Sequence, residues 1–178
     1  MKELVRYGFI LGIICFLASG ILAVVNAVTE PRIEIEKEKE ERLALKEVMP
    51  DSGNFEPVSK DGEFLYYKAY DSSGRLNGFV VKSESKGYSS DIEAMAGLGL
   101  NLEITNVKIL SQNETPGLGT RVTEPKFLGE FKGKDLASLS EVDTITGATI
   151  SSSAVINSVK DKISELKETL LKEVKNAK

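Results

Sequence analysis

EFLYYKAYDSSGRLNGFVVKSES, residues 63–85, contains two strand-like segments separated by a turn signal. The first segment, residues 63–70, is rich in aromatic residues, as is typical of strands. The four residues between them, Asp71 to Gly74 (DSSG), are types that favour tight turns. The stretch therefore predicts a β-hairpin.

Two further strand-like segments and a helix follow the hairpin. DIEAMAGLGL (residues 91–100) and LEITNVKILSQ (residues 102–112) predict two strands joined near Asn101. From Ser151 onward, apolar residues recur at spacings of three and four, which predicts a helix with one buried face. Those apolar residues are Val155, Val159, Ile163, Leu166 and Leu170. The expected fold class is α+β, with an antiparallel sheet and a C-terminal helix.

A membrane-spanning helix is expected before this domain. Residues 7–28, YGFILGIICFLASGILAVVNAV, carry no charge, and as a helix they rise about 33 Å, the thickness of the bilayer core. Lys2 and Arg6 precede the segment and acidic residues follow it, which predicts a cytoplasmic N-terminus and an extracytoplasmic domain. A cleaved signal peptide is the alternative, since VNA (residues 25–27) resembles a cleavage site. Its apolar core would be shorter, however.

The next segment, residues 29–50, is expected to be a helical connector. Thr29 is a candidate N-cap, Pro31 suits the first turn, and the helix is expected to end near Pro50. Such a helix either holds the domain at a fixed height or is simply a solvated helix with one packed stripe. The expected division is therefore 1–28 for the cytoplasmic tip and membrane helix, 29–50 for the connector, and 51–178 for the domain.

Composition excludes several classes of function. The 178 residues carry a net charge of −4 with basic and acidic residues interleaved, so nucleic acid is not an expected partner. The chain has no histidine, which removes the commonest general base and metal ligand. Its single cysteine, Cys15, can form no disulfide within the chain and cannot hold an iron–sulfur cluster alone. No catalytic residue and no metal site are expected.

The first candidate binding loop is QNETPGLGTRVTEPKF, residues 112–127. Pro116, Gly117 and Gly119 predict a tight loop whose backbone can approach a flat ligand closely, and Glu114, Thr115 and Thr120 add hydrogen-bonding groups. An ordinary turn is the alternative. The loop is not a dinucleotide-binding fingerprint, because no third glycine follows and no βα crossover precedes it.

The second candidate loop is TITGATISSS, residues 144–153, at the start of the predicted C-terminal helix. A helix N-terminus offers unpaired N–H groups and a partial positive charge, so main-chain donors can hold a phosphate there. The alternative is ordinary capping, in which Thr149 or Ser151 accepts hydrogen bonds from first-turn N–H groups.

Together the motifs resemble one family. DTITGAT (residues 143–149) matches the signature D-x-x-[ST]-G-A-[ST] of proteins that carry FMN on a threonine. GYSSDIEAMAGL (87–98), ETPGLGT (114–120) and TGATISS (146–152) also occur in the family's order. The chain resembles the G subunits of Rnf electron-transport complexes, departing at Ser90, where glycine is usual. The C subunits of sodium-pumping NADH:quinone oxidoreductases share the flavin domain but are generally longer.

The resemblance implies a role for each matching residue. Thr149 carries FMN through a phosphoester bond that a separate flavin transferase makes from FAD with magnesium. Asp143, Thr146, Gly147 and Ala148 belong to the attachment signature. The residues implied beside the flavin ring are Glu114, Thr115, Gly117 and Leu118, and Lys126 is placed near the phosphate by its position after the loop.

The implied function is electron carriage in a membrane ion-translocating ferredoxin:NAD oxidoreductase, with the other Rnf subunits and membrane lipid as partners. A non-redox membrane-tethered binding module is the competing hypothesis, in which both loops are only turns and caps. A third hypothesis, a flavin enzyme with its own substrate, requires a substrate pocket and a proton donor that the sequence does not identify.

Overall fold

The computed structural model describes residues 2–60 and 62–176. The chain divides into two compact units, residues 1–40 and 41–178. The boundary lies inside the expected connector 29–50, so the last part of that segment belongs to the folded domain.

Helix α1 (Lys2–Val48) includes both the expected membrane segment and most of the expected connector. The prediction that Thr29 caps a new helix is therefore wrong. Thr29 lies inside α1, and its hydroxyl donates a hydrogen bond to the Val25 carbonyl oxygen at 2.7 Å. Pro31 also lies within the helix. Because a proline has no N–H group, Pro31 leaves the Ala27 carbonyl without its usual donor from the next turn.

Within the described residues, α1 is the one helix long and apolar enough to cross a membrane. Its most apolar 18-residue window contains no buried residue. A core helix of a water-soluble protein would bury such a window against its own domain, so the exposed side chains fit a lipid environment.

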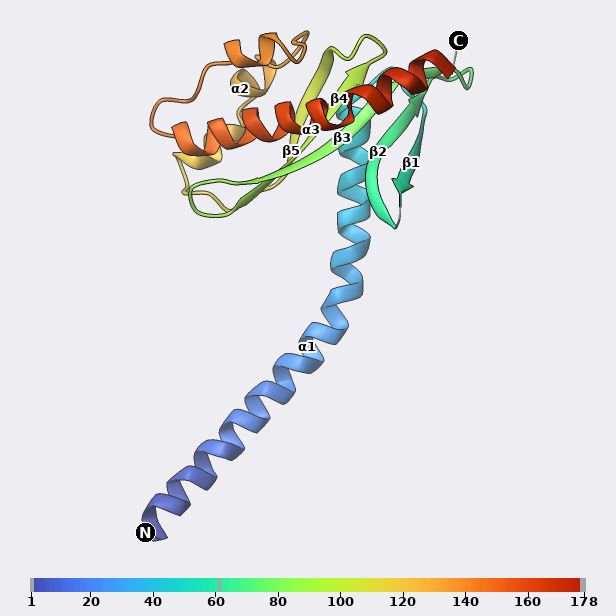
Figure 1. The fold of residues 1–178 in the computed structure, drawn as a ribbon. Coiled ribbons are helices and arrows are strands. Elements are labelled where there is room, and N and C mark those ends of the chain that lie inside the picture. The colour runs from blue at the N-terminus through green and yellow to red at the C-terminus, as the bar shows by residue number, and fades with distance from the viewer. Residues whose placement is uncertain (1, 61, 177–178) are drawn as a thin grey trace. The chain divides into compact units, whose positions relative to one another are not determined.

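Residues 41–176 contain a five-stranded antiparallel sheet in which each strand pairs with the next along the chain (Figure 1). Its strands are β1 (Asn54–Lys60), β2 (Glu63–Tyr70), β3 (Leu76–Lys86), β4 (Asp91–Gly99) and β5 (Ile104–Ser111). The predicted hairpin of β2 and β3 is confirmed, as are the two strands that follow it.

The sequence did not predict β1. This strand lies at the edge of the sheet and pairs only with β2, and Pro57 stands in its middle, opposite Tyr67. Proline cannot donate a ladder hydrogen bond, so it is confined to positions such as an edge strand. None of the residues of β1 is fully buried, so the alternation that would reveal a strand is weak.

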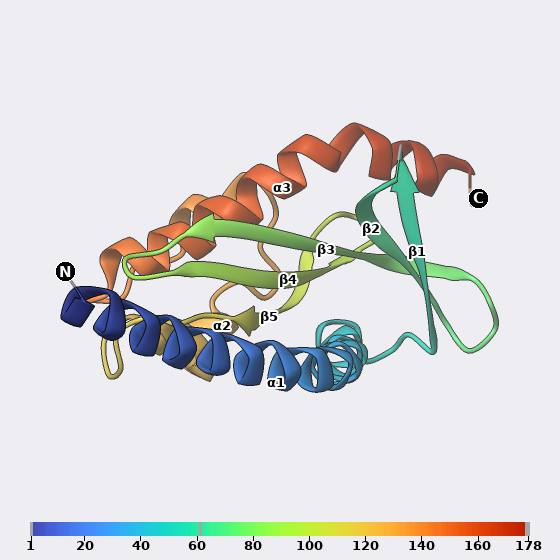
Figure 2. The same cartoon turned by 90° about the horizontal axis from the view of Figure 1, so that it is seen from below.

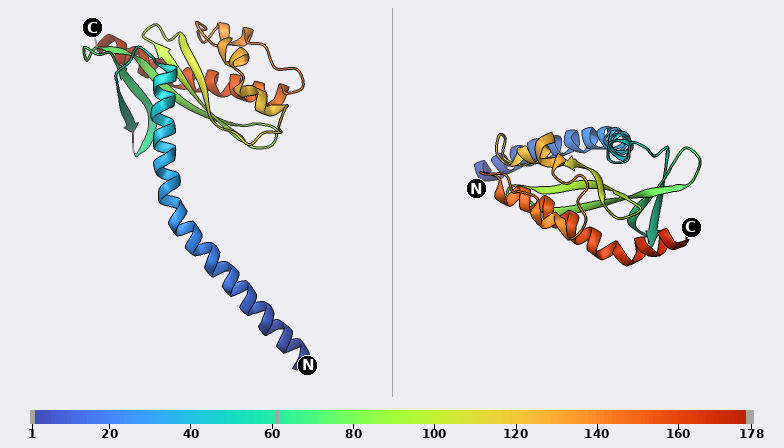
Figure 3. Two further views of the ribbon diagram at one scale, coloured as in Figure 1. Left: turned by 180° about the vertical axis from the view of Figure 1, so that it is seen from behind. Right: turned by 90° about the horizontal axis from the view of Figure 1, so that it is seen from above.

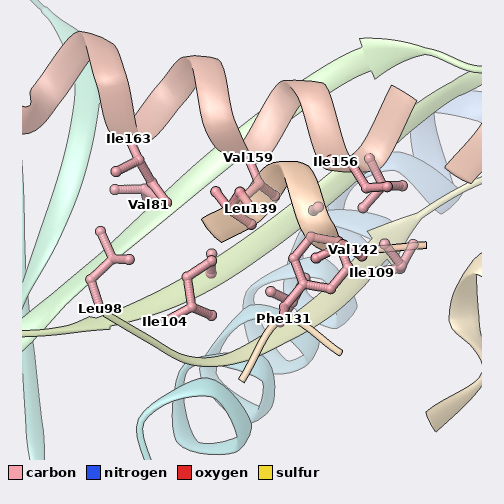
Figure 4. Close-up of a cluster of buried hydrophobic side chains, with 14 of the residues drawn as sticks. Val81, Leu98, Ile104, Ile109, Phe131, Leu139, Val142, Ile156, Val159 and Ile163 are labelled. Carbon is pink, nitrogen blue, oxygen red and sulfur yellow. The ribbon is translucent and has the colours of Figure 1, made fainter. Parts of the chain in front are cut away.

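Helix α3 (Thr149–Asn176) lies along one face of the sheet (Figure 2). Its predicted apolar stripe is confirmed, since all five of those residues are buried. A segment of short helices packs beside α3 on the same face: η1 (Gly119–Thr123), α2 (Pro125–Gly129) and η2 (Ser138–Glu141). Figure 4 shows Phe131, Leu139 and Val142 from this segment among side chains of α3 and the strands.

The last turns of α1 pack on the opposite face of the sheet (Figure 3). Ala44, Leu45 and Val48 join a small cluster with residues of β2, β3 and β4. Polar contacts surround that cluster: Thr105 Oγ1 donates to the Val48 carbonyl at 2.5 Å, and Lys108 pairs with Glu47 at 2.7 Å. The two long helices therefore pack on opposite faces of the sheet, α3 along one face and the end of α1 on the other.

Candidate functional site

A pocket of about 510 Å³ lies where three separate loops meet. The loops are the turn between β3 and β4, the segment that follows β5, and the entrance to α3. Its lining residues are Tyr88, Glu114, Thr115, Leu118, Gly119, Gly147, Ala148, Thr149, Ile150 and Ser151. The two loops that the sequence singled out therefore form one cavity.

Two glycine-containing turns shape this pocket. Leu118 N–H donates to the Thr115 carbonyl at 3.1 Å, and Ala148 N–H donates to the Ile145 carbonyl at 2.8 Å. The third residue of each turn is a glycine with positive φ, +76° at Gly117 and +83° at Gly147. Only glycine adopts such a conformation without strain, as at the third position of a type II turn.

The two turns also face each other. A Cβ on Gly147 would lie 3.6 Å from Leu118 Cδ2, and Arg121 Nη1 donates to the Thr146 carbonyl at 3.3 Å. The ETPGLG and TITGAT motifs are therefore packed together in space, although about thirty residues separate them in the sequence.

The hydroxyl groups at the start of α3 have different environments. Ser152 is buried, and its Oγ accepts from Ile145 N–H at 3.1 Å and donates to the Ala148 carbonyl at 2.8 Å. Ser151 is also buried and donates to Glu114 Oε2 at 2.6 Å. Thr149 is exposed on the pocket lining, and its hydroxyl makes no hydrogen bond with the described residues.

The capping alternative is therefore wrong for both candidate residues. Ser151 donates its proton to a carboxylate rather than accepting from the first turn, and the Thr149 hydroxyl accepts no first-turn N–H group of the described chain. The N-terminus of α3 at Thr149 offers first-turn N–H groups that have no acceptor within the helix, together with a partial positive charge of about half an electron. Among the described residues that line the pocket, none is Lys or Arg, so the helix is the electropositive element there.

Glu114 is the one charged residue of the lining and is only 5% exposed. Its carboxylate accepts from Ser89 N–H at 2.9 Å, Ser90 N–H at 3.0 Å and Tyr88 N–H at 3.3 Å, besides Ser151. Burial raises the pKa of Glu114, but the bonds from Ser151 and from the three backbone N–H groups outweigh it and hold that pKa below its ordinary value.

The departure at Ser90 leaves the backbone unstrained. Among the described residues, Leu102 is the only non-glycine residue with a positive φ. Ser90 therefore occupies an ordinary conformation. Its N–H donates to Glu114, and its hydroxyl accepts from Asn113 N–H at 2.8 Å. A glycine is therefore not required at this position.

Six of the predicted site residues line the pocket, and four do not. Those that line it are Glu114, Thr115, Leu118, Gly147, Ala148 and Thr149. Gly117 and Thr146 lie in the two turns just outside the lining, and Asp143 N–H donates to Glu130 Oε2 at 3.0 Å. Lys126 is exposed on α2 and away from the lining.

Gly119, which the sequence placed in the candidate loop, also lines the pocket, whereas sequence reasoning missed Tyr88, Ile150 and Ser151 as parts of the site. Three apolar side chains stand in the lining while remaining exposed: Tyr88 at 69%, Ile150 at 56% and Leu118 at 49%. Exposed large apolar side chains around one cavity are typical of a ligand-binding surface. The apolar residue at 150, directly after the signature threonine, was a usable signal.

A larger cleft of about 840 Å³ lies between β3 and α3, but its chemistry is different. Its lining is rich in charges of both signs, and some of them pair with each other, as Lys162 does with Glu165 at 3.1 Å. It contains none of the residues of either motif. The smaller pocket is therefore the better candidate site.

The residues of the smaller pocket fit a flavin mononucleotide. The Thr149 hydroxyl, which has no hydrogen-bond partner among the described residues, stands at the N-terminus of a 28-residue helix, where a phosphate is favoured. Beside it, apolar side chains flank a cavity of the size that small-molecule sites have. Glu114 and the exposed backbone of the two turns add polar groups.

Comparison with known proteins identifies the family. The FMN-binding domain family matches residues 87–164, and the RnfG N-terminal region matches residues 1–48. The G subunit of an ion-translocating oxidoreductase complex from Methanosarcina acetivorans is 34% identical over 172 residues, covering 89% of this chain and 92% of that protein. The chain belongs to this family of G subunits.

Other similar proteins are also G subunits of ion-translocating complexes. The G subunit of a proton-translocating ferredoxin:NAD(+) oxidoreductase complex from Clostridium ljungdahlii is 30% identical over 88% of this chain and 88% of its own length. The G subunit of a Na(+)-translocating ferredoxin:NAD(+) oxidoreductase complex from Acetobacterium woodii is 30% identical over 89% of each. The G-subunit membership and helix α1 together make the chain a single-pass membrane protein.

The solved structures share the fold. The crystal structure of NqrC from Shewanella oneidensis matches with a TM-score of 0.55 and 24% identity, covering 72% of this chain and 74% of that one. The C subunit of a Na(+)-translocating NADH-quinone reductase from Parabacteroides distasonis matches with a TM-score of 0.53 and 20% identity, over 67% and 78%. Because the sequence relatives are G subunits, the C-subunit alternative is not favoured.

Proposed function

We propose that this chain is the flavin-carrying subunit of a membrane ion-translocating ferredoxin:NAD oxidoreductase, with FMN esterified through its phosphate to Thr149. The names of its G-subunit relatives support the complex, and the FMN-binding domain match supports the cofactor. The observation that carries the proposal is the Thr149 hydroxyl at the helix N-terminus that borders the pocket: it is exposed and has no hydrogen-bond partner in the part of the chain that the structure describes.

The proposed attachment step transfers the FMN part of FAD to Thr149 and releases AMP. Thr149 Oγ attacks the flavin-side phosphorus of FAD, an Oγ–P bond forms, and the P–O bond to the AMP moiety breaks so that AMP leaves. The hydroxyl proton passes to a base of the flavin transferase, because this chain has no histidine and the Glu114 carboxylate is already occupied by its four donors. A threonine hydroxyl is not nucleophilic without such a base.

The residues around Thr149 then bind and orient what it carries. First-turn N–H groups of α3 are positioned to hold the phosphate without a cationic side chain. Tyr88, Leu118 and Ile150 offer apolar surface that excludes water from one side of the pocket. When bound, FMN supplies reversible uptake and release of one or two electrons, while the protein supplies its position and electrostatic environment.

We further propose that the N-terminus is cytoplasmic and the flavin domain extracytoplasmic. Lys2 and Arg6 precede the apolar segment of α1, whereas Glu30, Glu34 and Glu36 follow it. Basic residues favour the cytoplasmic side of a span. In this arrangement residues 7–28 contact membrane lipid and helices of the other Rnf subunits, and covalent attachment keeps the flavin from being lost outside the cell.

The test combines intact mass with activity. The full chain is produced with a flavin transferase, as wild type, Thr149→Val and Thr144→Val. Thr144 is a matched control because it is an exposed threonine of the same loop outside the pocket lining. We expect one FMN less one water on wild type and Thr144→Val and the bare chain for Thr149→Val. Complexes that contain Thr149→Val should lose ferredoxin-dependent NAD reduction. An unchanged mass and rate for Thr149→Val would remove the proposal.

A further inference from the structure

One buried carboxylate connects all three loops that form the pocket. Glu114 belongs to the segment after β5, its two oxygens accept three consecutive N–H groups of the β3–β4 turn, and it also accepts the hydroxyl of Ser151 in the first turn of α3. A carboxylate is an acceptor only, with about four lone-pair sites, so four donors use its full capacity. The site is therefore built for the ionised group.

The surroundings of this carboxylate leave little space. A Cβ on Gly87 would lie 2.5 Å from Glu114 Oε1, and a Cβ on Gly119 would lie 2.5 Å from Glu114 Oε2. Real Cβ atoms do not approach so closely, so both glycines are needed for the backbone to enclose the carboxylate. The glycine of GYSS and the second glycine of ETPGLG thus serve the same group.

The bond to Ser151 also fixes the rotation of α3. Successive residues of an α-helix are about 100° apart around the axis, so residues 149 and 151 are separated by about 200°. Ser151 is turned inward to Glu114 at the base of the pocket and is only 2% exposed, whereas Thr149, on the other side of the helix axis, is exposed at the pocket.

We propose that Glu114 is a positioning residue: through Ser151 it sets the first turn of α3 so that Thr149 is presented for flavin attachment. This inference rests on the proposed function of Thr149. It differs from the sequence-based expectation, which placed Glu114 beside the flavin ring. The depressed pKa of Glu114 agrees with a carboxylate that stays ionised in this setting.

The variants that test this role are Glu114→Gln and Ser151→Ala. A glutamine side chain has the same shape, but its amide group turns two N–H bonds toward groups that are themselves donors, so at least one partner is lost. Ser151→Ala leaves the carboxylate with its three backbone donors and removes only the link to α3. Ser158→Ala is the matched control, because Ser158 is a buried hydroxyl of the same helix that bonds to Ser83 at 3.2 Å, outside the pocket.

The measurement is the initial rate of flavin incorporation into the purified full chain, with flavin transferase, FAD and magnesium, over a range of chain concentrations. Misplacing a reacting oxygen by about 1 Å lowers rates by up to a hundredfold. We expect kcat to fall about tenfold or more for Glu114→Gln and by a smaller factor for Ser151→Ala. KM should be unchanged, because the exposed signature that the transferase binds is intact. Ser158→Ala should match wild type.

The other outcomes contradict either this inference or the proposed function. Wild-type rates in folded Ser151→Ala and Glu114→Gln overturn the inference, and so does an equal loss of rate in Ser158→Ala, which would show a general effect of α3 stability. If Glu114→Gln does not fold, Ser151→Ala decides the question alone. If the wild-type chain takes up no flavin, the proposed function is contradicted. If wild type and the variants take up flavin at equal rates, only the role of Glu114 is contradicted.

Discussion

The two faces of the sheet carry helices of different kinds. On one face α3 packs through buried residues along most of its length, and its first turn forms part of the pocket. On the other face α1 packs only through its last turns. Its contacts there are a smaller apolar cluster and polar contacts such as the Thr105–Val48 hydrogen bond and the Lys108–Glu47 ion pair. One face therefore builds the candidate pocket, while the other joins the domain to the end of α1.

The largest effect on stability is expected on the α3 face. Phe131 is fully buried and packs edge-to-face on Phe127, with ring centroids 5.3 Å apart. Phe131→Ala should lower the free energy of unfolding by about 3–5 kcal/mol, because the removed ring leaves a cavity. Urea unfolding of the detergent-solubilised chain, followed by circular dichroism, measures this. A loss below about 1 kcal/mol would contradict the central place of this core.

A smaller effect is expected on the α1 face. Val48 is fully buried in the smaller cluster, and Val48→Ala should cost about 1–3 kcal/mol. Hydrogen exchange sharpens the comparison between faces. Amides of residues 41–48 should exchange faster in Val48→Ala, while those of residues 114–119 keep their protection. Faster exchange in both regions would show that the two faces are not independent.

The Glu114 carboxylate gives the pocket its own pH dependence. Its folded-state pKa lies below the ordinary value of 4.5, so its stabilising contribution is complete above pH 4.5 and is lost as pH falls through the lower, folded-state pKa. The stability difference between wild type and Glu114→Gln should therefore shrink on acidification below pH 4.5. Urea midpoints at several pH values measure it. A difference that grows toward low pH would contradict the assigned hydrogen bonds.

The smallest effect on stability is expected at the proposed attachment residue itself. Thr149 is exposed and makes no hydrogen bond with the described residues, so Thr149→Val should change the free energy of unfolding of the flavin-free chain by no more than about 0.5 kcal/mol. The same urea titration checks this. A loss of several kcal/mol would show that Thr149 has a structural role instead.

Much of the fold was predictable because its signals are local. The aromatic-rich residues 63–70 and the DSSG turn predicted the hairpin, and the spacing of Val155, Val159 and Ile163 predicted the buried face of α3. The continuity of α1 was not predictable from Thr29 and Pro31, since both residues also occur at helix starts. The short helices between residues 119 and 141 lack room for a periodic pattern and were missed for that reason.

The site was predictable in part. Resemblance singled out both loops, but the function of Glu114 depends on partners that are distant in the sequence: the β3–β4 turn some 25 residues before it and Ser151, 37 residues after it. Hydrogen bonds between such positions have no signature in residue spacing. The six hydroxyls of residues 144–153 likewise look alike in sequence, and only packing separates buried Ser151 and Ser152 from exposed Thr149.

The central claim is that the Thr149 oxygen carries the flavin phosphate. The most direct test is fragmentation mass spectrometry of proteolytic peptides from the complex purified from its native membrane. We predict a peptide that spans residues 143–159 with one FMN less one water, and fragment ions that place this mass on Thr149. The same peptide without the added mass, or with it on another residue, would contradict the account.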